Sequence, residues 1–112
     1  MPVRVEEYDH IAVLAPVGEL SGAEAVELRA KVDELIDTRQ VVDVVIDLEK
    51  CPFVDSEGLE ALLWTKRRCE DLFGHAKLAR ADENVRKILE ITRLEPRFDC
   101  ADDLADAMKT MR

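Results

Sequence analysis

The distribution of hydrophobic and polar residues divides the chain into segments typical of strands and of helices. Residues 3–8 partly alternate apolar and polar side chains, and residues 11–15 are continuously apolar. The pair Asp9-His10 between them predicts a turn, so we expect the chain to begin with a β-hairpin. Residues 41–48 contain the β-branched run Val44-Val45-Ile46, which is typical of a central strand that is covered on both faces.

Apolar residues at helical spacing, preceded by capping residues, predict four helices. We expect these helices over residues 21–38, 56–73, 83–93 and 102–111, with N-caps at Ser21, Ser56, Asp82 and Asp102. Weaker strands are expected at residues 76–79 and 97–99. Because strands that alternate with helices imply right-handed parallel crossovers, the sequence predicts an α/β fold. The expected architecture is a mixed sheet of four to five strands with an N-terminal β-hairpin and four flanking helices, in one domain over residues 1–112.

The second predicted helix has an apolar stripe and an expected end at Gly74. The stripe consists of Leu59, Leu62, Leu63, Cys69, Leu72 and Phe73, which recur at helical spacing. Trp64 on the same helix is expected to pack in the core or in an interface. At the start of the first helix, Ser21 and Glu24 have the spacing of a capping box.

The net charge of −9 is distributed unevenly along the chain. Residues 1–60 carry 15 acidic and 5 basic side chains, a net charge of −10, whereas residues 61–112 carry 10 and 11, a net charge of +1. Nucleic acids and anionic membrane surfaces would be repelled, because binding to either requires cationic side chains. The acidic half is therefore either a solvated surface or a docking face for a basic protein partner.

The composition predicts a protein of the cytoplasm. No segment approaches the ~18–20 consecutive apolar residues of a membrane span, and residues 1–7 lack the apolar centre of a secretion signal. The three cysteines, Cys51, Cys69 and Cys100, have wide spacings without a Cys-x-x-Cys pair. Structural thiols in a reducing compartment explain them better than a zinc site or a redox site.

Residues for catalysis or cofactor binding are not recognisable in this sequence. The two histidines, His10 and His75, fall at predicted turns that are far apart in the chain. The spacing of Asp47, Asp55 and Glu57 matches no metal-binding loop, and the four glycines are scattered singly rather than gathered in a phosphate-binding loop. We therefore expect a binding protein, with no enzyme activity, cofactor or metal.

Ser56 lies at the expected start of the second helix, between two carboxylates. A hydroxyl group at an N-cap accepts a hydrogen bond from a free backbone N–H. The same position is close to solvent and to the positive end of the helix dipole, so it is also suited to carry a phosphate. The residue either only caps the helix or is a phosphorylation site.

The segment around Ser56 resembles the signature of STAS domains, the family of bacterial anti-sigma factor antagonists. That signature is a hydrophobic strand ending in Asp, a short connection, and Asp-Ser-Ser-Gly-Leu at the start of a helix. The matching residues are Ile46-Asp47-Leu48, Phe53-Val54 and Asp55-Ser56-Glu57-Gly58-Leu59. Upstream, Val17-Gly18-Glu19-Leu20 looks like the family's Gly-Glu-Leu turn, so the resemblance covers almost the whole chain. Glu57 replaces the family's second serine, and Ser21 replaces an acidic residue that commonly follows the turn.

This resemblance implies a role as a phosphorylation-switched binding protein. Ser56 corresponds to the family's phosphorylated serine. The implied partner is an anti-sigma factor that is also an ATP-dependent serine kinase, bound by the unphosphorylated form so that the sigma factor is released; a phosphatase would reverse the modification. The expected docking surface consists of Ser21, Gly22, Asp55, Ser56, Glu57, Gly58 and Leu59.

Two alternatives to this role remain open from the sequence. STAS domains also act as scaffold subunits of stress-signalling assemblies and as subunits of lipid-transport complexes. A response-regulator receiver with Asp47 as phosphate acceptor is the other alternative. In a receiver the first strand leads directly into a helix, whereas here a turn at Asp9-His10 leads into a second predicted strand.

Overall fold

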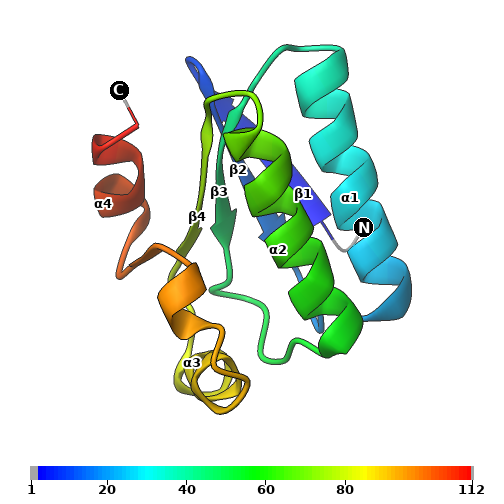
Figure 1. Ribbon diagram of the computed structural model, residues 1–112, viewed down its shortest axis with the longest axis vertical. Coiled ribbons are helices and arrows are strands. Elements are labelled where there is room, and N and C mark those ends of the chain that lie inside the picture. Colours follow the sequence, from blue (N-terminus) through cyan, green and yellow to red (C-terminus); the bar gives the residue numbers. More distant parts are fainter. Residues whose placement is uncertain (1–2, 112) are drawn as a thin grey trace.

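The computed structural model describes residues 3–111, which form one mixed five-stranded sheet flanked by helices (Figure 1). The strands are β1 (Val3–Tyr8), β2 (Ile11–Pro16), β3 (Asp43–Asp47), β4 (His75–Ala79) and β5 (Cys100–Ala101). The helices are α1 (Gly22–Asp37), α2 (Ser56–Glu70), α3 (Glu83–Ile91) and α4 (Leu104–Lys109), with a 3₁₀ turn η1 (Glu95–Arg97). The strand order is β1-β2-β3-β4-β5, with β1 antiparallel to β2 and the other pairs parallel. The predicted α/β fold with an N-terminal hairpin is confirmed.

A two-residue turn closes the hairpin of β1 and β2. Tyr8 pairs with Ile11, so only Asp9 and His10 lie between the strands. Asp9 has a φ of 59°, which suits a tight hairpin turn and is tolerated by Asp more readily than by most residues. The local sequence was therefore sufficient to predict this turn.

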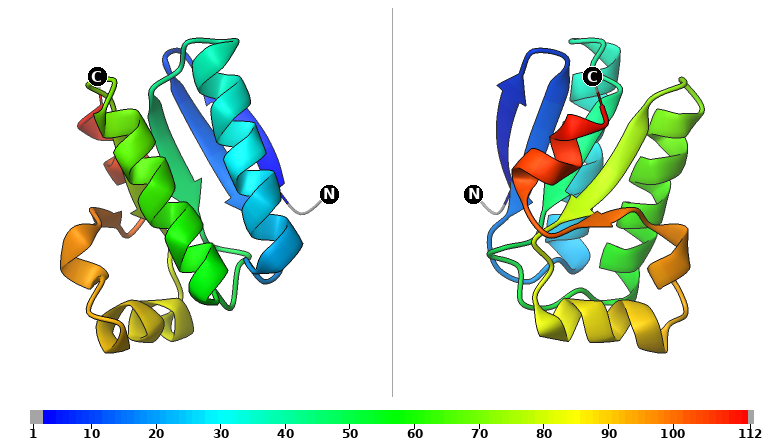
Figure 2. Two further views of the ribbon diagram at one scale, coloured as in Figure 1. Left: turned by 45° about the vertical axis from the view of Figure 1, so that its right-hand side comes forward. Right: turned by 90° about the vertical axis from the view of Figure 1, so that its left-hand side faces the viewer.

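The helices cover the two faces of the sheet unequally (Figure 2). Val44 and Ile46 of β3 belong to the main core beneath α1 and α2, whereas Val45 belongs to a smaller cluster beneath α4. Because β3 is the middle strand and is covered on both faces, its apolar run is continuous. Trp64 of α2 is half-buried against the core, and the guanidinium of Arg29 on α1 lies 5.3 Å from its ring centroid. None of the helices within residues 3–111 is long and apolar enough to cross a bilayer.

Helix α2 ends at Glu70, three residues earlier than predicted. Leu72 is 43% exposed and Phe73 is 95% exposed, so the predicted apolar stripe does not continue through these two residues. Phe73 has a φ of 64°, which turns the chain away from the helix. Gly74 then passes close to the Val42 backbone, where an added Cβ would come closer than 3.0 Å to the Val42 carbonyl. Gly74 is therefore required for a close backbone approach, and Phe73 adopts the left-handed conformation.

The last strand begins later than predicted. The paired residues are Cys100–Ala101, which lie opposite Leu78 and Ala79 of β4, and not residues 97–99. Phe98 is buried because it packs into the main core, without being part of a strand. The strand was predicted at the wrong position because the prediction included the apolar Phe98 in it.

The caps of the last two helices agree only in part with the prediction. Asp82 caps α3, and its carboxylate accepts a hydrogen bond from the Val85 N–H at 2.9 Å. Helix α4 is capped by Asp103 and not by Asp102. The carboxylate of Asp102 instead binds the guanidinium of Arg86 at 3.0 Å. The two adjacent aspartates thus have different roles, one in a helix cap and one in an ion pair with Arg86. The local sequence did not show which was which.

The thiol of Cys69 gives the fold an alkaline limit. Its burial inside α2 raises the pKa from 9.0 to about 12. Above about pH 9 the unfolded thiol releases a proton that the folded thiol retains, so this group makes stability fall with rising pH, by about 1.4 kcal/mol per unit until pH 12. Urea unfolding of wild type and Cys69→Ala at about pH 8 and about pH 10.5 should show the wild-type advantage shrinking. An unchanged difference between the two proteins would contradict this assignment.

Candidate functional site

Two loops meet at the carboxyl ends of the parallel strands β2 and β3. The Leu20 N–H donates to the Phe53 carbonyl at 2.9 Å, and the Asp55 N–H donates to the Leu20 carbonyl at 3.3 Å. Leu20 and Val54 thereby form an isolated parallel β-bridge. The loop that carries Ser21 and the start of α2 are consequently held side by side.

Gly58 allows this close contact between the helix and the loop. A Cβ at this position would come closer than 3.0 Å to the Leu20 carbonyl oxygen and would lie 2.7 Å from Cγ1 of Val54. Gly58 is buried in the first turn of α2. The glycine of the predicted signature therefore has a structural role, because it lets α2 start directly against the loop between β2 and α1.

Ser56 is the first residue of α2, and its side chain is exposed. The N-cap is Asp55, whose Oδ1 accepts a hydrogen bond from the Gly58 N–H at 2.8 Å. The prediction that Ser56 caps the helix is therefore wrong by one residue. Since its hydroxyl is not used for capping, Ser56 presents that group to solvent at the positive end of the helix dipole.

The surroundings of Ser56 are acidic but well solvated. Asp55 is half-buried, with one oxygen committed to the cap, and Glu57 is exposed. In the loop before α2, the buried thiol of Cys51 donates to the Phe53 carbonyl at 3.4 Å, and burial raises the pKa of this thiol. A polar substituent on Ser56 would extend into water and would not enter the core.

The other predicted contact residues lie on both sides of the same junction. Ser21 and Gly22 are half-buried, whereas Leu59 is buried beneath the surface and supports it. Ser21 is the N-cap residue of α1, but its side chain makes no capping hydrogen bond, so the predicted capping box is wrong. Gly22, the first residue of α1, has a φ of 41°. A positive φ of this kind favours glycine over other residues.

Two exposed apolar side chains beside the junction were not predicted as contact residues. Phe53, in the loop before α2, is 43% exposed, and Val17, in the loop before α1, is 38% exposed. The hydrogen bond from the Gly18 N–H to the Lys50 carbonyl, 2.9 Å long, ties these loops together. Phe53 was visible in the sequence as part of the signature, but only the fold shows that its ring reaches the surface.

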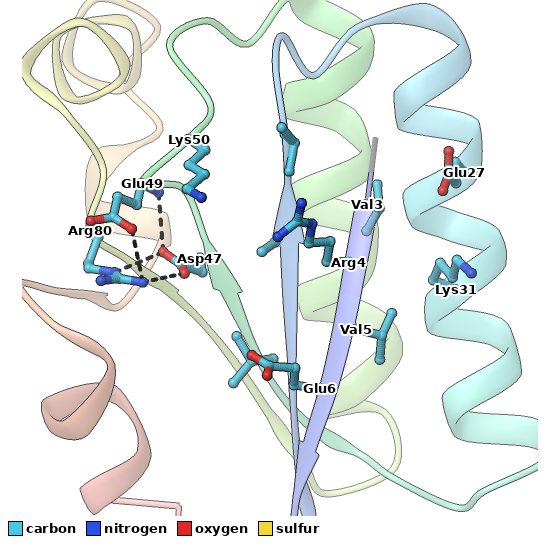
Figure 3. Close-up of a pocket in the computed structure, with 13 residues that line it drawn as sticks. Val3, Arg4, Val5, Glu6, Glu27, Lys31, Asp47, Glu49, Lys50 and Arg80 are labelled. Atoms are coloured by element: carbon cyan, nitrogen blue, oxygen red, sulfur yellow. Dashed lines mark hydrogen bonds and ion pairs between the residues drawn. The ribbon is translucent and has the colours of Figure 1, made fainter. Parts of the chain in front are cut away.

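Asp47 at the end of β3 is bound by Arg80, a residue that no pattern in the sequence singled out. Arg80 donates from Nε to Oδ1 at 3.1 Å and from Nη2 to Oδ2 at 2.7 Å, and it also pairs with Glu49 (Figure 3). Asp47 is only 7% exposed. A carboxylate that is buried and clamped in this way is a structural partner of Arg80, which argues against the receiver alternative.

The two histidines are far apart in the sequence, but both lie near the carboxylate of Asp43. Nδ1 of His75 lies 3.1 Å from Oδ1 of Asp43, and Nε2 of His10 lies 3.7 Å from Oδ2 of the same residue. This group is at the opposite end of β3 from Asp47, because Asp43 begins the strand. It is therefore separate from the junction at Ser56.

Substitution can test whether Asp55, and not Ser56, stabilises the start of α2. Asp55→Ala should reduce the free energy of unfolding by about 0.5–2 kcal/mol, because the N-terminal N–H of Gly58 loses its acceptor. Ser56→Ala should change it by less than about 0.5 kcal/mol, because Ser56 is exposed and does not cap. Urea unfolding of the two variants measures both values. A larger loss for Ser56→Ala than for Asp55→Ala would contradict the observed cap.

Known proteins resemble this chain over most of its length. A profile of the STAS domain matches residues 2–107. The chain is 29% identical over 84 residues to an anti-sigma F factor antagonist of Lysinibacillus sphaericus, covering 75% of this chain and 72% of that protein. Among solved structures, it is similar to an anti-sigma factor antagonist from Mycobacterium paratuberculosis (25% identity, TM-score 0.84, 98% and 92% of the two chains). It is also similar to the Bacillus cell fate determinant SpoIIAA in its phosphorylated form (23% identity, TM-score 0.77, 98% and 99%). With its family profile, its mixed sheet and its Asp-Ser-Glu-Gly-Leu helix start in agreement, the chain belongs to the STAS domain family.

Proposed function

We propose that this protein is an anti-sigma factor antagonist that is switched by phosphorylation of Ser56. Its unmodified form binds an anti-sigma factor that is also a serine kinase, and this binding releases the sigma factor. Transfer of a phosphoryl group to Ser56 ends the interaction, and a phosphatase restores it. The relatives named as anti-sigma factor antagonists support the choice of partner.

The observation that carries the proposal is the exposed hydroxyl of Ser56 at the first position of α2, which makes no hydrogen bond to residues 3–111. The neighbouring Asp55 already caps the helix, so modification of Ser56 removes no hydrogen bond from the fold. In the transfer step the Ser56 oxygen attacks the γ-phosphorus of ATP, ADP leaves, and the hydroxyl proton passes to a base on the kinase. ATP and magnesium belong to the kinase, so the proposal places the complex in the cytoplasm.

The proposed docking surface is the junction between the two loops. It consists of Ser21, Gly22, Phe53, Asp55, Ser56, Glu57 and Gly58, above the buried Leu59. Phe53 supplies an exposed apolar contact beside the polar start of α2. Because residues 1–60 carry a net charge of −10, association with a basic face of the kinase should be faster at low ionic strength.

Phosphorylation by the kinase encoded nearest to this chain in its genome tests the proposal. With ATP and magnesium, wild type should take up one phosphate on Ser56, and Ser56→Ala should take up none. Thr38→Ala is the matched control, because it removes an exposed hydroxyl outside the docking surface and leaves Ser56 in place. Phosphate on another residue, or equal labelling of Ser56→Ala, would overturn the assignment of Ser56.

A further inference from the structure

Strand β1 forms one edge of the sheet, and its outer side is free. In the order β1-β2-β3-β4-β5, β1 pairs only with β2 among residues 3–111. Figure 2 shows β1 at the outer side of the sheet, with α1 lying against the face of the sheet and not against this edge. An uncovered edge offers a row of backbone N–H and C=O groups to another strand.

The hairpin register identifies which backbone groups point outward. In a two-residue hairpin the pair that closes the turn, here Tyr8 and Ile11, is hydrogen-bonded, and hydrogen-bonded pairs alternate with non-hydrogen-bonded ones. Arg4, Glu6 and Tyr8 therefore bond to β2. The position of Pro16 agrees with this alternation, because it lacks an N–H and pairs with Val3 at a non-hydrogen-bonded position. Val3, Val5 and Glu7 consequently direct their N–H and C=O groups to the free edge.

The side chains of β1 alternate between two faces. Val3 and Val5 point toward α1, whereas Arg4 and Glu6 lie on the other face (Figure 3). A hollow of about 640 Å³ borders this edge on both faces, lined by Arg4 and Glu6 on one side and by Val3, Val5, Glu27 and Lys31 on the other. Arg4 and Glu6 are both exposed, and no ion pair of Arg4 occurs within the described part of the chain. Space and unpaired charge are thus both present beside this edge.

We propose that β1 pairs antiparallel with β1 of a second copy of this chain, centred on Val5, to form a symmetric dimer. A twofold axis perpendicular to the sheet places one residue of β1 opposite its own copy. Centring on Arg4, Glu6 or Glu7 would oppose two like charges, which destabilises a strand pair. Centring on Val5 places Arg4 opposite Glu6 of the second copy, and Glu6 opposite Arg4 of the second copy.

The same register also gives the most complete hydrogen bonding. Val5 pairs with Val5 of the second copy, Val3 with Glu7 of the second copy, and Glu7 with Val3 of the second copy. All of these residues have outward-directed backbone groups, so each pair exchanges both hydrogen bonds. Arg4 and Glu6 then occupy non-hydrogen-bonded pairs, where opposite side chains come closest. Charges on an edge strand usually prevent pairing, but here their alternation is self-complementary in one register only.

Charge reversal tests this pairing in solution. Sedimentation equilibrium of wild type from about 10 μM to about 1 mM should show a concentration-dependent dimer. Arg4→Glu or Glu6→Arg alone should raise the dimer dissociation constant about tenfold or more, because both symmetric pairs become repulsive. The double variant Arg4→Glu/Glu6→Arg should restore dimerisation, since it exchanges the two charges. All of these positions are exposed, so each variant should melt near wild type.

Matched controls separate local pairing from net charge. Lys87→Glu and Glu90→Arg make the same charge changes at exposed positions of α3 and should leave the dimer unchanged. In a Cys100→Ser background, Val5→Cys should form an intersubunit disulfide on oxidation, because opposed strand residues lie ~5.5 Å apart. Glu7→Cys should not, because its own copy lies several residues away. Three results would overturn the proposal. They are a wild-type protein that stays monomeric at the highest concentration, a double variant that dimerises no more tightly than the single variants, and equal cross-linking of Val5→Cys and Glu7→Cys.

Discussion

Ser56→Asp should weaken binding to the proposed partner, an anti-sigma factor kinase, a hundredfold or more while the protein melts near wild type. An aspartate adds one charge, and a phosphate about −1.5 to −2, beside Asp55 and the exposed Glu57. In the free protein this charge is solvated, and the helix dipole favours it by ~0.3–1 kcal/mol. An interface that closes over the junction removes water from like charges, which can cost several kcal/mol, and about 2.7 kcal/mol corresponds to a hundredfold loss.

Calorimetric titration of each variant against the kinase, with melting curves alongside, provides the measurement. Ser56→Ala should bind without being switched off by ATP, and it should keep its stability because Asp55 caps α2. Glu57→Ser should tighten binding of the unmodified form if Glu57 faces the partner. Wild-type affinity for Ser56→Asp, or unfolding of the phosphorylated protein, would rule out the switch and leave Ser56 as an ordinary first residue of the helix.

Gly58→Ala should be the most destabilising single substitution at the junction. The added Cβ would overlap the Leu20 carbonyl and approach Cγ1 of Val54, neither of which is the free end of a flexible side chain. Overpacking of this kind costs about 3 kcal/mol, which lowers the melting temperature by about 10 °C or more in a domain of this size. The start of α2 would have to move away from Leu20, so binding to the kinase should weaken as well, even at temperatures where the variant is folded.

Glu60→Ala is the matched control for Gly58→Ala, because Glu60 lies two residues further along α2 and is exposed. This control should change the melting temperature little, since it removes no packing contact and alanine favours the helix. Thermal unfolding followed by circular dichroism compares the two. Equal melting temperatures for Gly58→Ala and wild type would show that the junction can open at no cost, against the close packing described for it.

The N-cap of α2 shows where local sequence stops being decisive. Asp55 and Ser56 are both good capping residues, so the sequence alone did not discriminate between them. In the fold the Asp55 N–H bonds to the Leu20 carbonyl, 35 positions earlier in the chain, and Asp55 has an extended backbone. That distant contact fixes Asp55 as the cap and leaves the Ser56 hydroxyl free. Whether the candidate serine is structural or available for chemistry is thus decided by tertiary structure.

By itself the sequence determined the order of strands and helices, the hairpin, and the helix start that carries Ser56. These features depend on periodicity and turn residues within a few positions of one another, so their signals are local. Only the tertiary structure decided the pairing of Arg80 with Asp47, the shared Asp43 of the two histidines, and the exposure of Phe53 and Phe73. Each of these depends on which distant segments pack together, and apolar periodicity gives the type of an element but not its neighbour.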